Sequence, residues 1–211
     1  MKMTLEIAKA VVGGFSKPSK MPCFSFSIPA TTCKAGTKLR EVKGSVCSQC
    51  YAFRGNYRFG SVKKAHARRF ANLSHEFWIE AMAHLINNLE YSGHFRWHDS
   101  GDLQSVEHLA RIVAVCNLTP DTKHWLPTRE YGIVSKYIEN GGKIPANLIV
   151  RLSAHMVDGN PPTALAHKLG VQTSGVARGG FDCPASSQGN KCLRCRACWD
   201  VGRENINYKK H

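Results

Sequence analysis

Residues 94–102 read HFRWHDSGD, residues 123–130 read KHWLPTRE and residues 148–155 read LIVRLSAH. Each stretch is a short apolar run followed by polar residues, which predicts a strand that ends at a polar turn. The intervening residues predict two helices, one from the N-cap Ser105 to Val115 and one from Tyr131 to Asn140. Strands that alternate with helices in this way predict an α/β fold with a parallel sheet.

The same alternation extends to both sides of these stretches. Residues 62–89 carry apolar side chains at three- and four-residue steps, which predicts one or two amphipathic helices. Residues 164–169 predict a further helix and residues 171–176 a further strand. A complete eight-fold βα barrel needs about 250 residues, whereas this chain has 211. We therefore expect a partial (open) βα barrel with parallel strands.

The expected organisation is a single domain with three parts. Residues 1–60 form an N-terminal segment with cysteines, residues 61–178 the βα core, and residues 179–211 a cysteine-rich C-terminal segment. Right-handed crossovers bring the loops after parallel strands to one edge of the sheet, where ligands of α/β proteins bind. The candidate ligand-edge residues are Asp99, Ser100, Gly101, Asp102, Thr128, Arg129, Glu130, Ser153, Ala154, His155 and Thr173 to Gly175.

Several of these residues suit catalysis. His98 beside Asp99 and Asp102 is a candidate for proton transfer, since a neighbouring carboxylate sets the charge and orientation of an imidazole. The alternative is a hydrogen-bonded histidine at a strand end. Arg129 is a candidate clamp for a carboxylate or phosphate, or the partner of an acidic residue such as Glu130, and Arg151 is a weaker candidate for the same role.

Seven of the nine cysteines fall into two groups near opposite ends of the chain. The first group ends in a C-x2-C pair and the second in an overlapping C-x2-C-x2-C run. Such spacing turns several thiolates toward one centre, which a metal needs and a disulfide does not. The members are Cys33, Cys47 and Cys50 in the first group, and Cys183, Cys192, Cys195 and Cys198 in the second.

The spacing favours iron over zinc. Zinc takes four tetrahedral ligands, commonly from two C-x2-C pairs, whereas a C-x2-C-x2-C run and a cysteine next to proline, here Cys183-Pro184, are typical of [4Fe-4S] clusters. A group of three cysteines suits a cluster with one open iron. We expect one or two such clusters, with structural zinc as the alternative and buried thiols or disulfides as a third.

Charge and hydropathy limit the partners. Lysine and arginine number 29 against 15 acidic residues, a net charge of +14, and such an excess often marks a nucleic-acid-binding protein. The basic residues are densest over residues 54–69, where Tyr57 and Phe59 are interleaved with them; a solvated helix face is the alternative. No stretch is long and apolar enough to cross a membrane. The N-terminus lacks a signal-peptide pattern, so we expect a cytoplasmic protein, in the host cell if a phage encodes it.

The chain resembles the phage gene product 88 family over about residues 20–200. The resemblance is carried by Cys33, Cys47-x2-Cys50-Tyr51, Gly55-Asn56-Tyr57, Trp97-His98-Asp99-Ser100-Gly101-Asp102, Thr128-Arg129-Glu130, and Cys183-Pro184 with Cys192-x2-Cys195-x2-Cys198-Trp199. That resemblance implies no particular activity.

A looser resemblance is to radical S-adenosylmethionine enzymes. These enzymes have a partial βα barrel and three N-terminal cysteines, the last two spaced as in Cys47-x2-Cys50-Tyr51, and many have a C-terminal segment for an auxiliary cluster. Ser100-Gly101-Asp102 is similar to their glycine-acid turn, which binds the amino group of the cofactor. The interval between Cys33 and Cys47 is longer than in those enzymes. The resemblance implies that Ser100, Gly101 and Asp102 bind S-adenosylmethionine, and Ser153 is a further ligand-edge candidate.

The sequence therefore predicts an iron-sulfur oxidoreductase with redox or radical S-adenosylmethionine-like chemistry. It would take electrons from a donor and act on a small molecule, neither of which the sequence identifies. The alternative is a zinc-stapled, basic nucleic-acid-binding phage protein.

Overall fold

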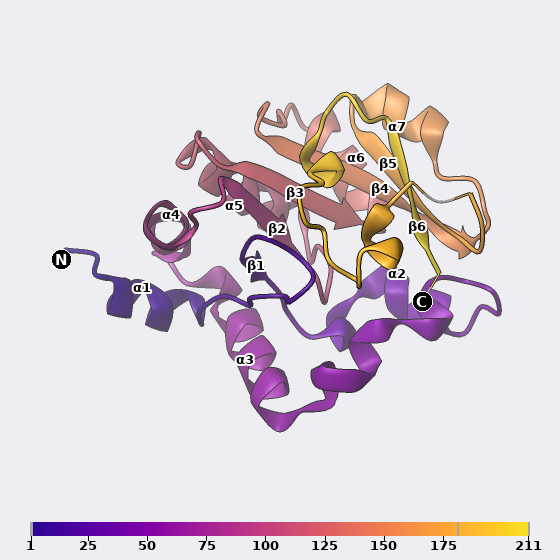
Figure 1. The fold of residues 1–211 in the computed structure, drawn as a ribbon. Coiled ribbons are helices and arrows are strands. Elements are labelled where there is room, and N and C mark those ends of the chain that lie inside the picture. The colour runs from indigo at the N-terminus through magenta and orange to yellow at the C-terminus, as the bar shows by residue number, and fades with distance from the viewer. Residues whose placement is uncertain (1, 181, 211) are drawn as a thin grey trace.

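The computed structural model describes residues 2–180 and 182–210, and its centre is a six-stranded sheet in which every pair of neighbouring strands is parallel (Figure 1). The strands lie in the sheet in the order in which they occur in the chain. They are β1 (Ser25–Phe26), β2 (His94–Trp97), β3 (Lys123–Thr128), β4 (Leu148–Val157), β5 (Gln172–Ala177) and β6 (Asn205–Lys209). This confirms the predicted α/β fold with a parallel sheet, and the sequential order is the one that βα barrels use.

Seven α-helices of the described residues flank the sheet. They are α1 (Leu5–Val12), α2 (Lys34–Arg40), α3 (Gly60–Ala71), α4 (Trp78–Leu89), α5 (Val106–Asn117), α6 (Tyr131–Glu139) and α7 (Thr163–Leu169). The predicted N-cap forms, because the Ser105 hydroxyl accepts a hydrogen bond from the backbone N–H of His108 at 3.0 Å. The apolar pattern over residues 62–89 produces two helices, α3 and α4, rather than one.

The core lies between the sheet and the helices α4, α5 and α6. Trp78 of α4 packs edge-on against Phe26 of β1, with ring centroids 5.6 Å apart, and lies beside Trp97 of β2. All three side chains are fully buried. This packing orders the amino-terminal half of the sheet, so the strand ends at its carboxyl edge are fixed in position.

The two cysteine groups lie on two connections of the sheet. The N-terminal cysteine segment, residues 27–59, follows β1 and contains α2 and the short 3-10 helices η2 (Cys47–Gln49), η3 (Tyr51–Phe53) and η4 (Gly55–Arg58). The C-terminal cysteine segment, residues 182–204, connects β5 to β6 and contains η6 (Pro184–Ser187) and η7 (Ala197–Trp199). No helix within the described residues is long and apolar enough to cross a membrane.

Candidate functional site

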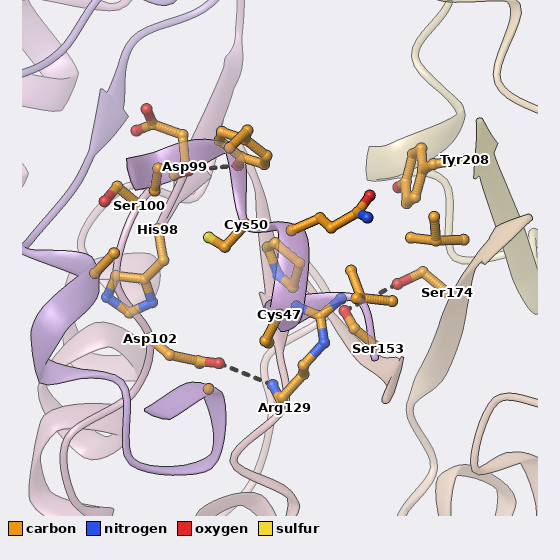
Figure 2. Close-up of a pocket in the computed structure, with 18 of the residues that line it drawn as sticks. Cys47, Cys50, His98, Asp99, Ser100, Asp102, Arg129, Ser153, Ser174 and Tyr208 are labelled. Carbon is orange, nitrogen blue, oxygen red and sulfur yellow. Dashed lines mark hydrogen bonds between the residues drawn. The ribbon is translucent and has the colours of Figure 1, made fainter. Parts of the chain in front are cut away.

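A cavity of about 790 Å³ opens at the carboxyl edge of the sheet, and both cysteine segments contribute to its wall (Figure 2). In Figure 2, Cys47 and Cys50 lie between a side formed by His98, Ser100 and Asp102 and a side formed by Ser153, Ser174 and Tyr208. The structure brings nearly all predicted site residues to this cavity: Cys33, Cys47, Cys50, His98, Asp99, Ser100, Gly101, Asp102, Arg129, Ser153, Cys183, Cys192 and Cys198. Cys195 instead lines a second cavity on the other side of its turn.

The thiols of Cys33 and Cys47 both lie beside Gly36 of α2. A Cβ on Gly36 would lie 2.9 Å from the Cβ of Cys33, and 3.7 Å from the sulfurs of both Cys33 and Cys47. Burial raises the pKa of the Cys33 thiol, and the neighbouring Asp102, Cys50 and Cys47 add to the rise. The absence of a side chain at residue 36 therefore leaves room beside two sulfurs.

Asp99 attaches the N-terminal cysteine segment to the sheet. Its Oδ1 accepts hydrogen bonds from the hydroxyls of Ser25, at 2.6 Å, and Ser27, and its Oδ2 accepts one from Tyr57 at 2.8 Å. The Asp99 carbonyl accepts a further bond from the Tyr51 hydroxyl at 2.5 Å. This carboxylate thus holds the residues that directly follow Cys50, and His98 is not among its hydrogen-bond partners.

His98 and Ser100 are two residues of the cavity wall with unsatisfied polar groups. Within the described part of the chain, neither ring nitrogen of His98 nor the Ser100 hydroxyl has a hydrogen-bond partner, although both side chains are buried. Burial, with neighbouring His108 and Arg96, lowers the pKa of His98 well below its ordinary value, so the imidazole is neutral at pH 7. The ring of His108 lies 5.3 Å away. Unpaired buried polar groups on a cavity wall are suited to receive a ligand.

Asp102 fixes the end of β3 next to the thiols. Its carboxylate accepts hydrogen bonds from the Thr128 hydroxyl at 2.6 Å and from the backbone N–H groups of Arg129 and Leu103 at 2.9 and 2.8 Å. Burial raises the pKa of Asp102 to about 6. The Arg129 side chain donates from Nε to the Ala154 carbonyl at 3.1 Å and lines the cavity. The sequence-based alternative of an Arg129–Glu130 ion pair is not found within the described residues.

Gly101 allows the turn after β2 to approach β1 closely. Its φ is +82°, and a Cβ there would lie 2.2 Å from Cγ1 and 2.9 Å from the carbonyl oxygen of Ile28. Only glycine fits such a position. The turn that carries Ser100 and Asp102 therefore depends on a residue without a side chain.

Sequence reasoning missed Arg96 as a cavity residue. Its guanidinium stacks on Trp125 at 4.5 Å and donates to the Tyr51 hydroxyl at 3.3 Å, while its buried Nε has no partner within the described residues. Burial disfavours the charged form, but neighbouring Tyr51 and Asp99 outweigh it and raise the pKa of Arg96 above its ordinary value. The alternation of β2 was the available signal, because Phe95 and Trp97 face the core and Arg96 must face the other way.

The C-terminal cysteines lie against an aromatic cluster. Cys192 and Cys198 pack against Trp125, Trp199 and Tyr208. The Cys198 sulfur and the Tyr208 hydroxyl are hydrogen-bonded at 3.3 Å. Burial raises the pKa of the Cys198 thiol to about 11. Cys23, which the spacing left outside both groups, is also buried in this cluster.

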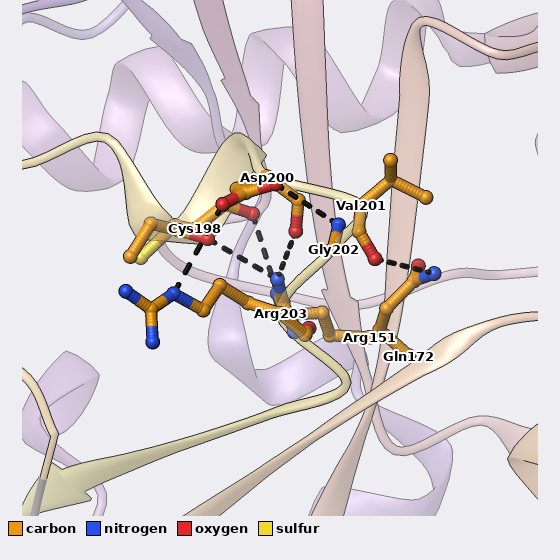
Figure 3. Close-up of polar contacts among 8 residues, drawn as sticks. Arg151, Gln172, Cys198, Asp200, Val201, Gly202 and Arg203 are labelled. Atoms are coloured by element: carbon orange, nitrogen blue, oxygen red, sulfur yellow. Dashed lines mark hydrogen bonds and ion pairs between the residues drawn. The ribbon is translucent and has the colours of Figure 1, made fainter.

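Arg151 has a different role from the anion clamp that the sequence suggested. Its side chain is fully buried and donates hydrogen bonds to five backbone carbonyls, and Figure 3 shows it beside Cys198, Asp200 and Arg203. The acceptors are Cys198 at 3.3 Å, Ala197 at 3.2 Å, Asp200 at 2.8 Å, Arg203 at 2.7 Å and Thr173 at 3.2 Å. Arg151 therefore attaches the C-terminal cysteine segment to β4 and is not available to bind an anion.

The expected metal centres are not formed as such. Over residues 2–180 and 182–210, no group of three or more His, Cys, Asp or Glu side chains is arranged to hold a metal ion. Every cysteine has a free thiol, and no disulfide joins the two groups. A metal at the N-terminal group would need a rearrangement that brings the three sulfurs to one point.

The family comparison agrees with the resemblance noted from the motifs. The sequence profile of the gene product 88 family matches residues 3–201. The chain belongs to this family. Neither the curated proteins nor the solved structures contain a match.

Proposed function

We propose that this member of the gene product 88 family is an iron-sulfur protein whose first cluster, of the [4Fe-4S] type, is bound by Cys33, Cys47 and Cys50. The observation that carries the proposal is that these thiols line the same cavity as the unpartnered His98 and Ser100. A thiol set and unsatisfied ligand-binding groups thus lie together at the edge of the sheet where α/β proteins bind ligands.

The residues present fit such a cluster. Gly36 leaves space beside the sulfurs of Cys33 and Cys47, and η2 holds Cys47 and Cys50 in one turn, with the Cys50 N–H donating to the Cys47 carbonyl at 3.2 Å. Thiols must lose their protons to bind iron, and the nearby Arg129 favours the thiolate of Cys47 although burial raises its pKa. Three protein ligands would leave one iron of a four-iron cluster without a protein ligand.

The cavity residues would bind a small molecule next to that open iron. The most concrete candidate is S-adenosylmethionine, to which a reduced cluster supplies one electron when bound. Ser100 and His98 provide unpaired hydrogen-bonding groups, and the hydroxyls of Ser153 and Ser174, 3.0 Å apart, lie on the opposite wall. Asp102 would act as a positioning residue, because three donors already occupy its carboxylate.

His98 would be the proton acceptor of the site. It is neutral at pH 7, and no protein group occupies its ring nitrogens within the described residues. A ligand in the cavity could therefore transfer a proton to His98 without first displacing a protein partner. Electrons would come from an external donor, so the class of reaction is oxidoreduction.

The C-terminal thiols would bind a second cluster or complete the first. Cys183, Cys192 and Cys198 line the same cavity as the N-terminal group. Cys195 lies on the far side of the turn, so its participation would require the turn to rotate. A second cluster needs at least three of these four sulfurs.

The test is electron paramagnetic resonance of anaerobically purified, dithionite-reduced protein with and without S-adenosylmethionine. We expect a reduced-cluster signal whose shape changes when S-adenosylmethionine is added. Ser100→Ala should retain the signal and weaken the change, whereas Leu193→Ala, on the exposed part of the C-terminal turn, should match the wild type. A colourless protein with stoichiometric zinc would refute the cluster; a cluster signal that S-adenosylmethionine leaves unchanged would refute the cofactor alone.

A further inference from the structure

The N-terminal cysteine segment continues into a long stretch that carries charge of one sign only. Residues 42–75 contain no aspartate or glutamate. They contain the basic residues Lys43, Arg54, Arg58, Lys63, Lys64, Arg68 and Arg69. This stretch therefore supplies seven of the 14 net positive charges of the chain.

The fold buries some of the residues of this stretch against the body of the protein and exposes others to solvent. His66 and Arg69 of α3 are buried, and Arg69 donates to the carbonyl of Gly14 at 2.8 Å and to the hydroxyl of Ser16 at 2.7 Å. The helical period then turns Lys63 and Lys64 away from the body of the protein. Two residues that the sequence placed in the basic patch are thus structural.

The outward face carries unpaired charge. Arg54, Arg58, Lys63 and Lys64 are exposed, and no side-chain hydrogen bond or ion pair of theirs occurs within the residues that the structure describes. Among the described residues, ion pairs join Arg178 to Asp158 and Arg203 to Asp200, and both pairs lie far from this segment in the chain. We call the surface formed by Arg54, Arg58, Phe59, Lys63 and Lys64 the basic face.

Aromatic side chains accompany the charges. Phe59 at the start of α3 is 60% exposed. Phe70, about three helical turns further on, is 39% exposed. Cationic side chains that follow a phosphate backbone, together with aromatic rings on which bases stack, form the typical surface for single-stranded nucleic acid.

The basic face also adjoins the cavity. The 3-10 helices η3 and η4 contribute Tyr51, Phe53 and Tyr57 to the cavity wall, and Arg54 and Arg58 lie on the same two turns. Figure 1 shows α3 below the sheet, continuous with this region. The basic face therefore adjoins the segment that forms part of the cavity wall.

We propose that the basic face binds single-stranded nucleic acid. The binding goes beyond the cavity chemistry proposed above and does not depend on a metal, because none of the residues of the basic face is a candidate ligand. An acidic protein surface would satisfy the charges but not the exposed rings, so nucleic acid is the better match.

The experiment is fluorescence anisotropy of a dye-labelled single-stranded DNA 20-mer, an RNA of the same sequence and the DNA duplex, titrated with the full-length chain over a range of salt concentrations. With about four phosphates contacted, log affinity for the single strand should fall with log salt with a slope near −3. Neutralising Arg54, Arg58, Lys63 and Lys64 to glutamine should weaken binding at least about tenfold and flatten this slope. Phe59→Ala should weaken single-strand binding more than duplex binding.

A matched control removes the same charge elsewhere. Lys123, Lys136, Lys143 and Lys168 are exposed on the βα core, and their joint replacement by glutamine should leave affinity within about twofold, since a specific face and not net charge is responsible. Equal losses in the two quadruple variants would overturn the proposal. So would the absence of binding to either single strand at low salt, or tighter binding of the duplex with no effect of Phe59→Ala.

Discussion

The two cysteine segments are attached to the sheet by opposite means. A buried carboxylate, Asp99, holds the N-terminal cysteine segment through tyrosine and serine hydroxyls, whereas a buried guanidinium, Arg151, holds the C-terminal cysteine segment through backbone carbonyls. Four of the five carbonyls that Arg151 contacts belong to the C-terminal cysteine segment, whereas the N-terminal cysteine segment is also held by backbone hydrogen bonds between Gly44 and Val157 and between Val46 and His155. We infer that the C-terminal segment depends on Arg151 more than the N-terminal segment depends on Asp99.

Arg151→Met should produce the largest effect on stability. The change leaves five buried carbonyls without their donor, so the free energy of unfolding should fall by about 3–5 kcal/mol. Urea unfolding measures the loss. Arg129→Met is the matched control, because the Arg129 side chain makes a single recorded backbone hydrogen bond, and its cost should be about 1 kcal/mol. Equal losses would show that Arg151 does not fix the C-terminal segment.

Mild acid should lower the free energy of unfolding through His108 of α5. Burial lowers the pKa of His108, which lies beside His98, to about 4. Because the pKa of His108 is lower in the folded chain than in the unfolded chain, its neutral form stabilises the fold above pH 6.5. That stabilisation is lost as the pH falls from 6.5 toward 4. Between pH 7 and pH 5 the contribution should fall by about 2 kcal/mol.

Comparison of urea unfolding at pH 7 and pH 5 tests this titration. His108→Gln should reduce the decrease in stability by about 2 kcal/mol. Asp102 acts in the opposite direction: its pKa is raised to about 6, so its protonation stabilises the fold as the pH falls through that value. A variant with the same pH dependence as the wild type would contradict the assignment of a buried, neutral His108.

Asp99→Asn should have a smaller effect, confined to the N-terminal attachment. An amide keeps one oxygen acceptor but cannot accept on both sides of the group, so the free energy of unfolding should fall by about 1–3 kcal/mol. Urea unfolding again provides the measurement. Asp200→Asn is the control, since its ion pair with Arg203 is exposed and 4.0 Å long, and it should change stability by less than about 0.5 kcal/mol. An unchanged free energy of unfolding in Asp99→Asn would show that the carboxylate does not hold the N-terminal cysteine segment.

Gly36→Ala should separate stability from metal binding. A methyl group in the α2 helix gains up to about 1 kcal/mol from helix propensity but enters the space between the sulfurs of Cys33 and Cys47. We expect stability within about 1 kcal/mol of the wild type and a clear loss of bound iron. Gly132→Ala, in α6 with open space around it, should stabilise the protein without a change in iron. Full iron content in Gly36→Ala would argue against metal at these thiols.

The sequence predicts those parts of the fold that have a regular spacing of apolar residues and helix-capping residues. The residues from 94 to 177 follow strand and helix patterns closely, and Ser105 and Gly170 mark helix ends as expected, the latter with a φ of +64°. The strands β1 and β6 were missed. β1 has two residues, too few for a pattern, and β6 follows the cysteines, where residues 205–209 show no apolar run.

The site was predictable as a set of residues but not as a set of contacts. Nearly all of the residues that strand ends and cysteine spacing identified line the cavity, but many other lining residues, such as Arg96, Trp125 and Tyr208, were not predicted. These sequence patterns did not reveal that Asp99 bonds to Tyr51 and Tyr57 rather than to His98, because those partners lie more than 40 positions away in the chain. Arg151 was misread for the same reason, since its acceptors are carbonyls, which every residue has.

The central claim is that the N-terminal thiols bind an iron-sulfur cluster, and the most direct test is iron and acid-labile sulfide per chain after anaerobic purification. We expect both in the wild type and in Cys116→Ala, whose thiol lies buried in the core. The double variant Cys47→Ser/Cys50→Ser should lose the iron and sulfide of that cluster while it remains folded. Stoichiometric zinc without sulfide, or iron and sulfide that are unchanged in the double variant, would contradict the account.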